Sequence, residues 1–363
     1  MIFFLAAIAT IILLVILFFR LPSFGGKLKG ERLLRVQQSP NYHNGAFHYP
    51  AKTELMSGAG NYFSVMKKFL KKDPQKQPNS PLPTVQTDLK TLPTDETTLV
   101  WFGHSSYFLQ INDFKMLVDP VLSERISPVQ FAGTKNYLGT RLYSIDDIPE
   151  LDCILITHDH YDHLDYLTIV SLNPKVKKIY TSLGVGAHLE HWGIDANKIH
   201  EFDWWDSCSI ASDIQLTATP ARHFSGRHLT NRNQTLWSSF VLTTANHRIF
   251  IGGDSGYGDH FKEIGEKFGS FDLVIMETGQ YNIQWANIHA MPEEAVQASI
   301  DLHGKIMLPV HWGKFTLALH PWQEPIERVL ASAKELGVKV TTPIIGEKLV
   351  LDKVYPVSQW WNL

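Results

Sequence analysis

Residues 153–163, with the sequence CILITHDHYDH, decide the fold. The first half, CILIT, is a short run of apolar and β-branched residues, which is typical of a buried strand. The second half is polar. In an extended segment the side chains of His158 and His160 project to the same side, so they can bind one metal ion. The turn that follows can direct Asp162 and His163 at a second ion, because imidazole and carboxylate are the ligands expected for zinc or a similar cation.

The composition is that of an ordered globular chain that is unusually rich in histidine. The chain has 363 residues, of which 44% are hydrophobic, and this allows a sizeable core. It contains 17 histidines but two cysteines, Cys153 and Cys208, so neither a disulfide framework nor a cysteine-based metal cluster is expected. The net charge of −3 is too close to neutral for a protein that binds nucleic acid over its whole surface.

Strand-like and helix-like segments alternate from about residue 97 onwards, which predicts an α/β fold of layered sheets and helices. Polar residues follow several of the expected buried strands. His223 comes after LTATPAR, Asp254 after RIFIGG, and His311 after KIMLPV. Because functional residues gather where strands end, these three side chains can meet the His-rich loop at one edge of a sheet.

The distribution of charge along the chain is uneven. Residues 1–19 carry no ionisable side chain, and residues 20–78 carry eleven Lys or Arg against three acids, a net of +8. Since the whole chain is at −3, residues 79–363 must carry −11. A basic stretch beside an apolar one is what an anionic membrane surface attracts.

The apolar stretch at the N-terminus has the length of a membrane span. As a helix, its 19 residues would reach roughly 28 Å, close to the ~30 Å hydrocarbon core of a bilayer. We therefore predict a transmembrane anchor at 1–19 and a basic, Pro-rich tether at 20–93. Because positive residues stay on the cytoplasmic side, we expect a single-pass membrane protein with a cytoplasmic catalytic domain. The alternative is an apolar helix that lies on the protein itself.

Several motifs give the sequence a family resemblance. The HxHxDH motif, a later His, a Gly-Gly-Asp and a strand-end His resemble the metallo-β-lactamase superfamily. Within it, the chain resembles the phospholipases D that hydrolyse N-acylphosphatidylethanolamine, through WFGHSSYFL, LVDPVLSERISP, PARHFSGR, GGDSGY, HAMPEEAV and PVHWGKFTLALHPWQEP. The resemblance implies a four-layered αββα sandwich at 94–352, followed by a tail at 353–363. The apolar N-terminus departs from the family, whose eukaryotic members associate with membranes peripherally.

The resemblance also implies a site with two zinc ions. The first ion would be held by His158, His160 and His223. The second ion would be held by Asp162, His163 and His311, and Asp254 would bridge the two ions. Asp119 and His104 would support ligands through hydrogen bonds. Asp162 and His289 would take part in catalysis, Asp162 by holding a proton and His289 by polarising or protonating the scissile group.

The implied reaction is the hydrolysis of a phosphodiester in a membrane lipid, with N-acylphosphatidylethanolamine giving an N-acylethanolamine and phosphatidic acid. The implied partners are a phospholipid, a membrane and a second copy of the chain, whereas the acidic body disfavours nucleic acid. Two other interpretations stay open. One is a metal-dependent hydrolase of a lactone or a small soluble phosphodiester. The other is a non-catalytic, membrane-tethered metal-binding scaffold, which the loss of some metal ligands would indicate. None of the seven ligand positions is missing.

Overall fold

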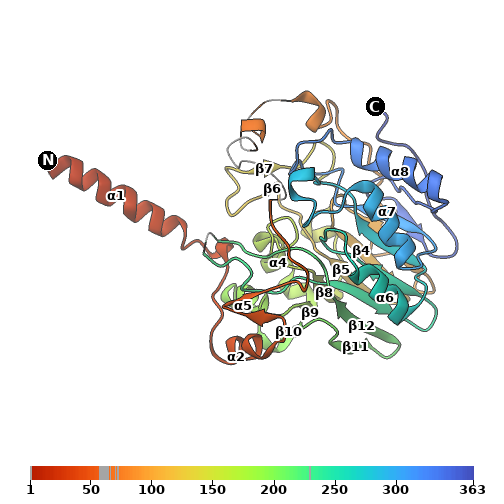
Figure 1. The fold of residues 1–363 in the computed structure, drawn as a ribbon, viewed down its shortest axis with the longest axis horizontal. Helices are drawn as coiled ribbons and strands as arrows, with labels where there is room; N and C mark the ends of the chain where they lie inside the picture. The colour runs from red at the N-terminus through yellow and green to blue at the C-terminus, as the bar shows by residue number, and fades with distance from the viewer. Residues whose placement is uncertain (1, 57–64, 66, 70, 72, 229) are drawn as a thin grey trace.

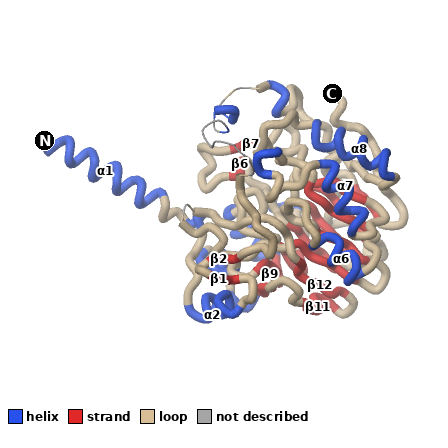
Figure 2. The backbone as a smooth tube through the Cα atoms, in the orientation of Figure 1, coloured by secondary structure: helices blue, strands red, loops and turns tan. Residues whose placement is uncertain are grey.

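The computed structural model describes residues 2–56, 65, 67–69, 71, 73–228 and 230–363. Two β-sheets form its centre, and helices lie outside them (Figures 1 and 2). The first sheet has seven strands, in the spatial order β10 (Ile199–Phe202), β9 (Val176–Ser182), β8 (Leu151–Ile156), β5 (Phe114–Val118), β4 (Tyr107–Ile111), β3 (Thr97–Trp101) and β17 (Lys348–Val350). The second has six, in the order β11 (Ser207–Ala211), β12 (Ile214–Thr219), β13 (Ser239–Thr243), β14 (Arg248–Ile251), β15 (Leu273–Glu277) and β16 (Met307–Val310).

The remaining elements are helices and two small hairpins. The hairpins pair β1 (Tyr42–His43) with β2 (Ala46–Phe47), and β6 (Arg125–Ile126) with β7 (Thr134–Lys135). The α-helices are α1 (Ile2–Phe18), α2 (Gly30–Gln38), α4 (Tyr166–Leu172), α5 (Gly186–His191), α6 (His260–Phe268), α7 (Pro292–Asp301) and α8 (Glu324–Leu336). The short 3₁₀ helices are η1 (Pro22–Phe24), η2 (Pro74–Lys76), η3 (Ile145–Asp147), η4 (Asn173–Lys175), η5 (Ala196–Lys198) and η6 (Ile283–Trp285).

The alternation of side chains along each strand produces the layers. In β8, Cys153 and Leu155 belong to the apolar layer between the sheets, whereas Ile154 and Ile156 belong to the layer under α4 and α5. In β14, Ile249 and Ile251 likewise face the other sheet, while the intervening phenylalanine packs with α6, α7 and α8. Both faces of each strand are therefore buried, which explains why the strands read as continuous apolar runs. The predicted α/β sandwich is confirmed.

The topology collects several strand ends at one edge. In the first sheet β5, β8 and β9 are parallel, and β3 runs in the same direction because two antiparallel pairings separate it from β5. In the second sheet β14, β15 and β16 are parallel, and β12 runs with them for the same reason. Crevices at the carboxyl ends of such strands are where α/β proteins bind ligands. The loops that follow these strands carry all the candidate site residues.

The expected membrane anchor requires a correction. Helix α1 projects away from the rest of the molecule (Figure 1). It spans 17 residues, about 25 Å. The helix ends at Phe18 because the chain from Phe19 to Leu21 turns out of it ahead of Pro22. Within the described residues, no helix is long and apolar enough to cross a membrane. This finding overturns the predicted transmembrane helix at 1–19 and the single-pass localisation, on which the cytoplasmic placement of the catalytic domain rested.

Part of the segment expected to be a tether packs against the sandwich. Val36 of α2 and Phe47 of β2 are fully buried in one apolar cluster with Leu183, Leu236 and Trp237. The predicted tether also includes residues 57–64, 66, 70 and 72, which lie outside the described part of the chain. The domain boundaries at 94 and 352 stay predictions.

Candidate metal centre

Three histidines meet where β8 and β12 end. His158 and His160 lie in the loop directly after β8, and His223 lies in the loop after β12. Nδ1 of His160 is 2.9 Å from Nε2 of His158 and 3.2 Å from Nε2 of His223. With Asp254, these residues offer ligand atoms that all lie within 4.8 Å of one another. This first half-site contains the three histidines that the sequence assigned to the first ion.

A second group lies beside the first. Asp162 and His163 come from the same loop as His158, and His311 follows β16. Nε2 of His163 is 3.5 Å from Oδ2 of Asp162, and Nε2 of His311 is 4.0 Å from that same oxygen. His104, which was expected only as a support, joins these three in a group that could hold an ion. We call Asp162, His163 and His311 the second half-site.

Asp254 lies between the two half-sites. Its Oδ2 is 3.2 Å from Nε2 of His163, 3.7 Å from that of His223 and 3.8 Å from that of His158. The preceding glycine, Gly253, has a φ of +60°, and a Cβ on it would come within 3.1 Å of Thr157. Gly253 of the GGD motif therefore lets this backbone approach Thr157, at the start of the His-rich loop.

The free ring and carboxylate atoms at the centre fit a metal site. Four of the buried polar atoms that have no hydrogen-bond partner among the described residues belong to this cluster: Nε2 of His160, Nε2 of His163, Nε2 of His311 and Oδ1 of Asp254. Buried polar atoms are normally satisfied, so an orphaned set of nitrogen and oxygen atoms needs an explanation. Imidazole nitrogens with carboxylate oxygens are a donor set for zinc and similar divalent ions, so the residues fit the implied group.

The protonation of the histidines favours ligation as well. Burial, together with the neighbouring imidazoles, holds the pKa of His158, His223 and His311 well below the ordinary value. Burial lowers the pKa of His160 to about 4. These rings are therefore neutral at pH 7, which is the form that binds a metal. His163 differs, because Asp254, Asp162 and Asp119 outweigh its burial and raise its pKa.

Side chains hold the second half-site in place. Oδ2 of Asp119 accepts from Nδ1 of His163 at 2.7 Å, and Nε2 of His104 donates to Oδ2 of Asp162 at 2.9 Å. Asp119 is itself fixed by the Thr157 amide and hydroxyl. Such contacts orient ligand rings and select their tautomers. Asp119 and His104 therefore each lie within hydrogen-bond distance of a residue that the resemblance implied as a ligand.

Three of these residues have a backbone conformation that is rare outside glycine. φ is +55° at His104, +41° at Asp119 and +67° at His311. A left-handed residue other than glycine costs on the order of 1–3 kcal/mol, and such residues cluster at functional sites. The loops of His104 and His311 stabilise each other, since the His311 amide donates to the His104 carbonyl at 2.9 Å and the His104 amide donates to the Trp312 carbonyl at 2.9 Å.

Two residues of the site were missed by the sequence analysis. Ser105 lies 2.9 Å from Nδ1 of His311, through its hydroxyl. Glu277, the last residue of β15, is fully buried, and its Oε2 lies 2.7 Å from Nδ1 of His289. Burial raises the pKa of the Glu277 carboxyl well above its usual range. The strand pattern FDLVIME ends in this carboxylate. Asp254 and His311 were identified as polar residues at the end of an apolar strand pattern, and the same criterion would have identified Glu277.

An arginine fixes the loop that carries most of the ligands. Arg227 is buried, and its guanidinium donates to the backbone carbonyls of Asp159 and Leu164 at 2.7 Å each, at the two ends of the loop. It also donates to the Ser23 carbonyl, at 2.8 Å. The N-terminal segment around η1 is thereby attached directly to the metal loop.

The site opens into a mostly apolar cavity of about 310 Å³, which we call the apolar chamber. Five of its lining residues belong to the site: His160, Asp162, Asp254, His289 and His311. The apolar lining residues are Leu55, Met56, Phe69, Phe224, Trp285, Ile288 and Leu317. A molecule at the centre therefore meets metal ligands on one side and hydrocarbon on the other.

A family model described as the β-lactamase superfamily domain matches residues 115–312, which contain every candidate ligand. The chain belongs to the metallo-β-lactamase superfamily and is a metal-dependent hydrolase. An uncharacterized protein of Mycobacterium tuberculosis is 37% identical to it over 332 residues, covering 90% of this chain and 88% of the relative.

Two relatives carry the name N-acyl-phosphatidylethanolamine-hydrolyzing phospholipase D. The protein from Caenorhabditis elegans is 34% identical over 229 residues and covers 60% of this chain, and the mitochondrial protein from Saccharomyces cerevisiae is 32% identical over 249 residues and covers 66%. The chain spans 64% and 52% of the length of these relatives.

Solved structures share the fold at low identity. A possible metal-dependent hydrolase from Veillonella parvula has a TM-score of 0.56 at 17% identity, covering 70% of this chain and all of its own. A metallo hydrolase from Ignicoccus hospitalis has a TM-score of 0.55 at 17% identity, covering 71% of this chain and 99% of its own.

Proposed function

We propose that this hydrolase uses two zinc ions to cleave a phosphodiester in a phospholipid, with N-acylphosphatidylethanolamine as the first substrate to test. The observation that carries the proposal is the opening of the site into the apolar chamber, which suits a substrate that joins a phosphoryl group to hydrocarbon. The names of the two phospholipase D relatives support the same substrate. A phospholipid surface as a partner and a homodimer stay predictions.

His158, His160 and His223 would hold one ion, and Asp162, His163 and His311 the other, with Asp254 between them. When bound, two such ions would stabilise charge on the phosphoryl oxygens and supply hydroxide at neutral pH. The two proton transfers of the reaction are assigned to side chains of the protein.

Asp162 is placed to receive the proton of the attacking water. Its Oδ2 is oriented by His104, and the residue lines the apolar chamber. Attack on phosphorus breaks the bond to the ethanolamide oxygen, which leaves as an alcohol once it is protonated. Because Nδ1 of His289 is engaged by Glu277, its Nε2 is the atom left to face the substrate. An Nε2–H there would supply that proton while Nδ1 takes one from the Glu277 carboxyl, whose pKa is raised.

The test uses purified full-length protein with N-acylphosphatidylethanolamine in mixed micelles, beside the His158→Ala variant. Mass spectrometry would measure N-acylethanolamine and phosphatidic acid. We expect both products from the wild type, their loss with a chelator, and neither from the variant.

No release by a protein that holds about two ions per chain would overturn the lipid substrate while leaving a hydrolase. Lactones and small soluble phosphodiesters would then be assayed. Turnover that persists after full metal removal would overturn the dinuclear mechanism itself.

A further inference from the structure

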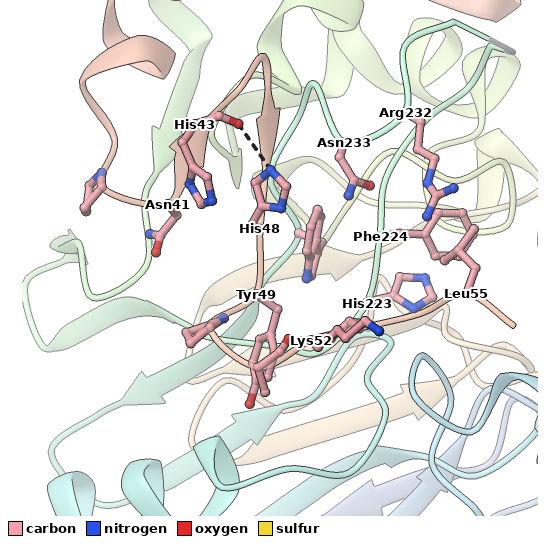
Figure 3. Close-up of a pocket in the computed structure, with 15 residues that line it drawn as sticks. Asn41, His43, His48, Tyr49, Lys52, Leu55, His223, Phe224, Arg232 and Asn233 are labelled. Carbon is pink, nitrogen blue, oxygen red and sulfur yellow. Dashed lines mark hydrogen bonds between the residues drawn. The ribbon is translucent and has the colours of Figure 1, made fainter. Parts of the chain in front are cut away.

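A second, polar cavity adjoins the metal centre (Figure 3). Its volume is about 650 Å³, within the range of small-molecule sites. One wall is formed by the segment from residue 40 to 55, and the other by residues near His223 and Arg232. We call this cavity the polar chamber. Its lining residues are Pro40, Asn41, His43, His48, Tyr49, Pro50, Ala51, Lys52, Thr53, Leu55, His223, Phe224, Arg232, Asn233 and Trp237.

The charges around the polar chamber have one sign. Its lining includes the cations Lys52 and Arg232, and it includes no aspartate or glutamate. Among the described residues, no carboxylate pairs with Arg232. Lys52 pairs with Glu54 at 2.5 Å, but that acid is exposed and does not line the cavity, and a pair so open to solvent is weak enough for an anion to compete.

The walls of the polar chamber are fastened to each other and to the body. The guanidinium of Arg222 donates to the Lys52 carbonyl at 3.0 Å and to the Thr53 hydroxyl at 3.2 Å, which fixes the backbone at Lys52. The Phe47 amide donates to the Asn233 carbonyl at 2.7 Å, and the Asn233 side chain donates back to the Phe47 carbonyl at 3.3 Å. These contacts hold the chain beside Arg232 in position, so the polar chamber is a built feature.

The two chambers adjoin each other at the metal centre. Leu55 and Phe224 line both of them. His223 lines the polar chamber, and its Nε2 lies 3.2 Å from His160, which lines the apolar one. Figure 3 shows Arg232 and Lys52 extending from opposite walls toward His223 and Phe224. One substrate can therefore reach both chambers while its scissile group lies at the ligands.

We infer that the polar chamber is a subsite for a phosphate-class anion, with Arg232 and Lys52 as its cationic contacts. The anion is either a second anionic group of the substrate, beyond the scissile phosphodiester, or free phosphate. The inference rests on the proposed function, because the subsite binds part of the substrate only if a phosphodiester is cleaved at the metal centre. The apolar chamber then binds the hydrocarbon part, so the substrate is divided between an anionic and an apolar end.

The first experiment measures binding and needs no turnover. Equilibrium dialysis with radiolabelled inorganic phosphate would compare the metal-loaded wild type with Arg232→Gln/Lys52→Gln. Phosphate held at the metal ions is common to both proteins, so the difference reports the polar chamber. Loss of two charged contacts should weaken that binding about tenfold. Lys348→Gln/Lys334→Gln, which changes one exposed cation on β17 and one on α8, matches the loss of two positive charges and should bind as the wild type does.

The second experiment identifies the source of the anion. Two 4-nitrophenyl phosphodiesters of equal length would be compared, one ending in a phosphate and the other in a hydroxyl. If the substrate supplies the anion, the wild type prefers the phosphate-terminated ester, and the double variant loses that preference through a raised KM. Weaker dialysis binding without a preference for either ester would assign the subsite to free phosphate.

Unchanged phosphate binding in the double variant, together with an unchanged ratio between the two esters, would overturn the inference. Failure of the hydrolase proposal gives a different result, since neither ester would then be cleaved. The dialysis comparison would still decide the subsite in that case.

Discussion

The two half-sites of the metal centre are supported in different ways. In the first, Nδ1 of His158 lies 3.0 Å from the hydroxyl of the adjacent Thr157, and Nδ1 of His223 lies 2.7 Å from the Ile288 carbonyl. These partners are a sequence neighbour and a backbone atom. In the second half-site, by contrast, side chains from separate loops support every ligand: Asp119 supports His163, His104 supports Asp162 and Ser105 supports His311.

The difference shows where the site is vulnerable. A backbone carbonyl cannot be removed by a side-chain substitution, so the first half-site should tolerate changes among its neighbours other than Thr157. The second should respond to single substitutions that touch no ligand, because its supporting contacts are side chains. The following predictions test that contrast, beginning with a residue shared by both half-sites.

Asp254→Ala should have the largest effect. Its carboxylate lies between the half-sites, within 3.8 Å of histidines from each, so its loss removes a contact that both share. We expect loss of bound metal and a drop in kcat/KM on the order of a thousandfold, about 4 kcal/mol. Elemental analysis and kinetics check this. Asp213→Asn, at an exposed turn, is the control, and an Asp254→Ala protein with full metal content would contradict the assignment.

Asp119→Asn should weaken the second half-site more than the first, which it reaches only through the Thr157 hydroxyl. The amide cannot accept from Nδ1 of His163 and from Thr157 as the carboxylate does, so the His163 ring loses its fixed orientation. Changes of this kind lower metal affinity about 10–100-fold. Titration with a chelator should release one ion early and leave the other closer to its behaviour in the wild type. Equal weakening of both ions would show that the half-sites are not independent.

Glu277→Gln should affect catalysis without affecting metal content. The carboxyl of Glu277 lies 2.7 Å from Nδ1 of His289, and an amide in its place can donate to that nitrogen but cannot exchange a proton with it. We expect kcat to fall about tenfold, less than the roughly 10²–10⁴-fold that a general acid itself contributes, with KM and the melting temperature near those of the wild type. Glu277→Asp should recover part of the rate. A fall in metal content would instead make Glu277 a support of the metal centre.

Ser105→Ala should have the smallest effect. It removes one hydrogen bond to Nδ1 of His311, which is worth about 1 kcal/mol, or about fivefold in affinity for the second ion. Ser212→Ala, an exposed serine in the turn before β12, provides the matched control. Chelator titration distinguishes them, and identical curves for the two variants would mean that Ser105 contributes nothing to the orientation of His311.

The sequence predicted the α/β sandwich and the metal-site chemistry because both depend on short-range patterns. The loop after β8 holds four candidate ligands within six residues, and Asp254 and His311 directly follow apolar runs that end at the same sheet edge. The contact between Glu277 and His289 depends instead on how the connection between β15 and α7 folds back on the end of its own strand. No spacing in the sequence reports that pairing.

The prediction for the N-terminus failed for a different reason. The length of the apolar run predicted one membrane-spanning helix. However, the backbone at the C-terminus of a helix decides where that helix ends. The turn at Phe19 and Arg20, closed ahead of Pro22, ends α1 at Phe18. Hydropathy alone cannot place such an end. The attachment of η1 to the metal loop through Arg227 was likewise invisible, because Ser23 is 204 residues away.

The most direct test of this account is the metal content of the purified wild type, His223→Ala and His311→Ala, measured by elemental analysis after equilibration with zinc. We predict about two ions per chain for the wild type and about one for each variant. Chelator titration should show that the retained ion differs between the variants, because His223 and His311 belong to different half-sites. A wild type that binds a single ion, lost equally in both variants, would contradict the dinuclear centre.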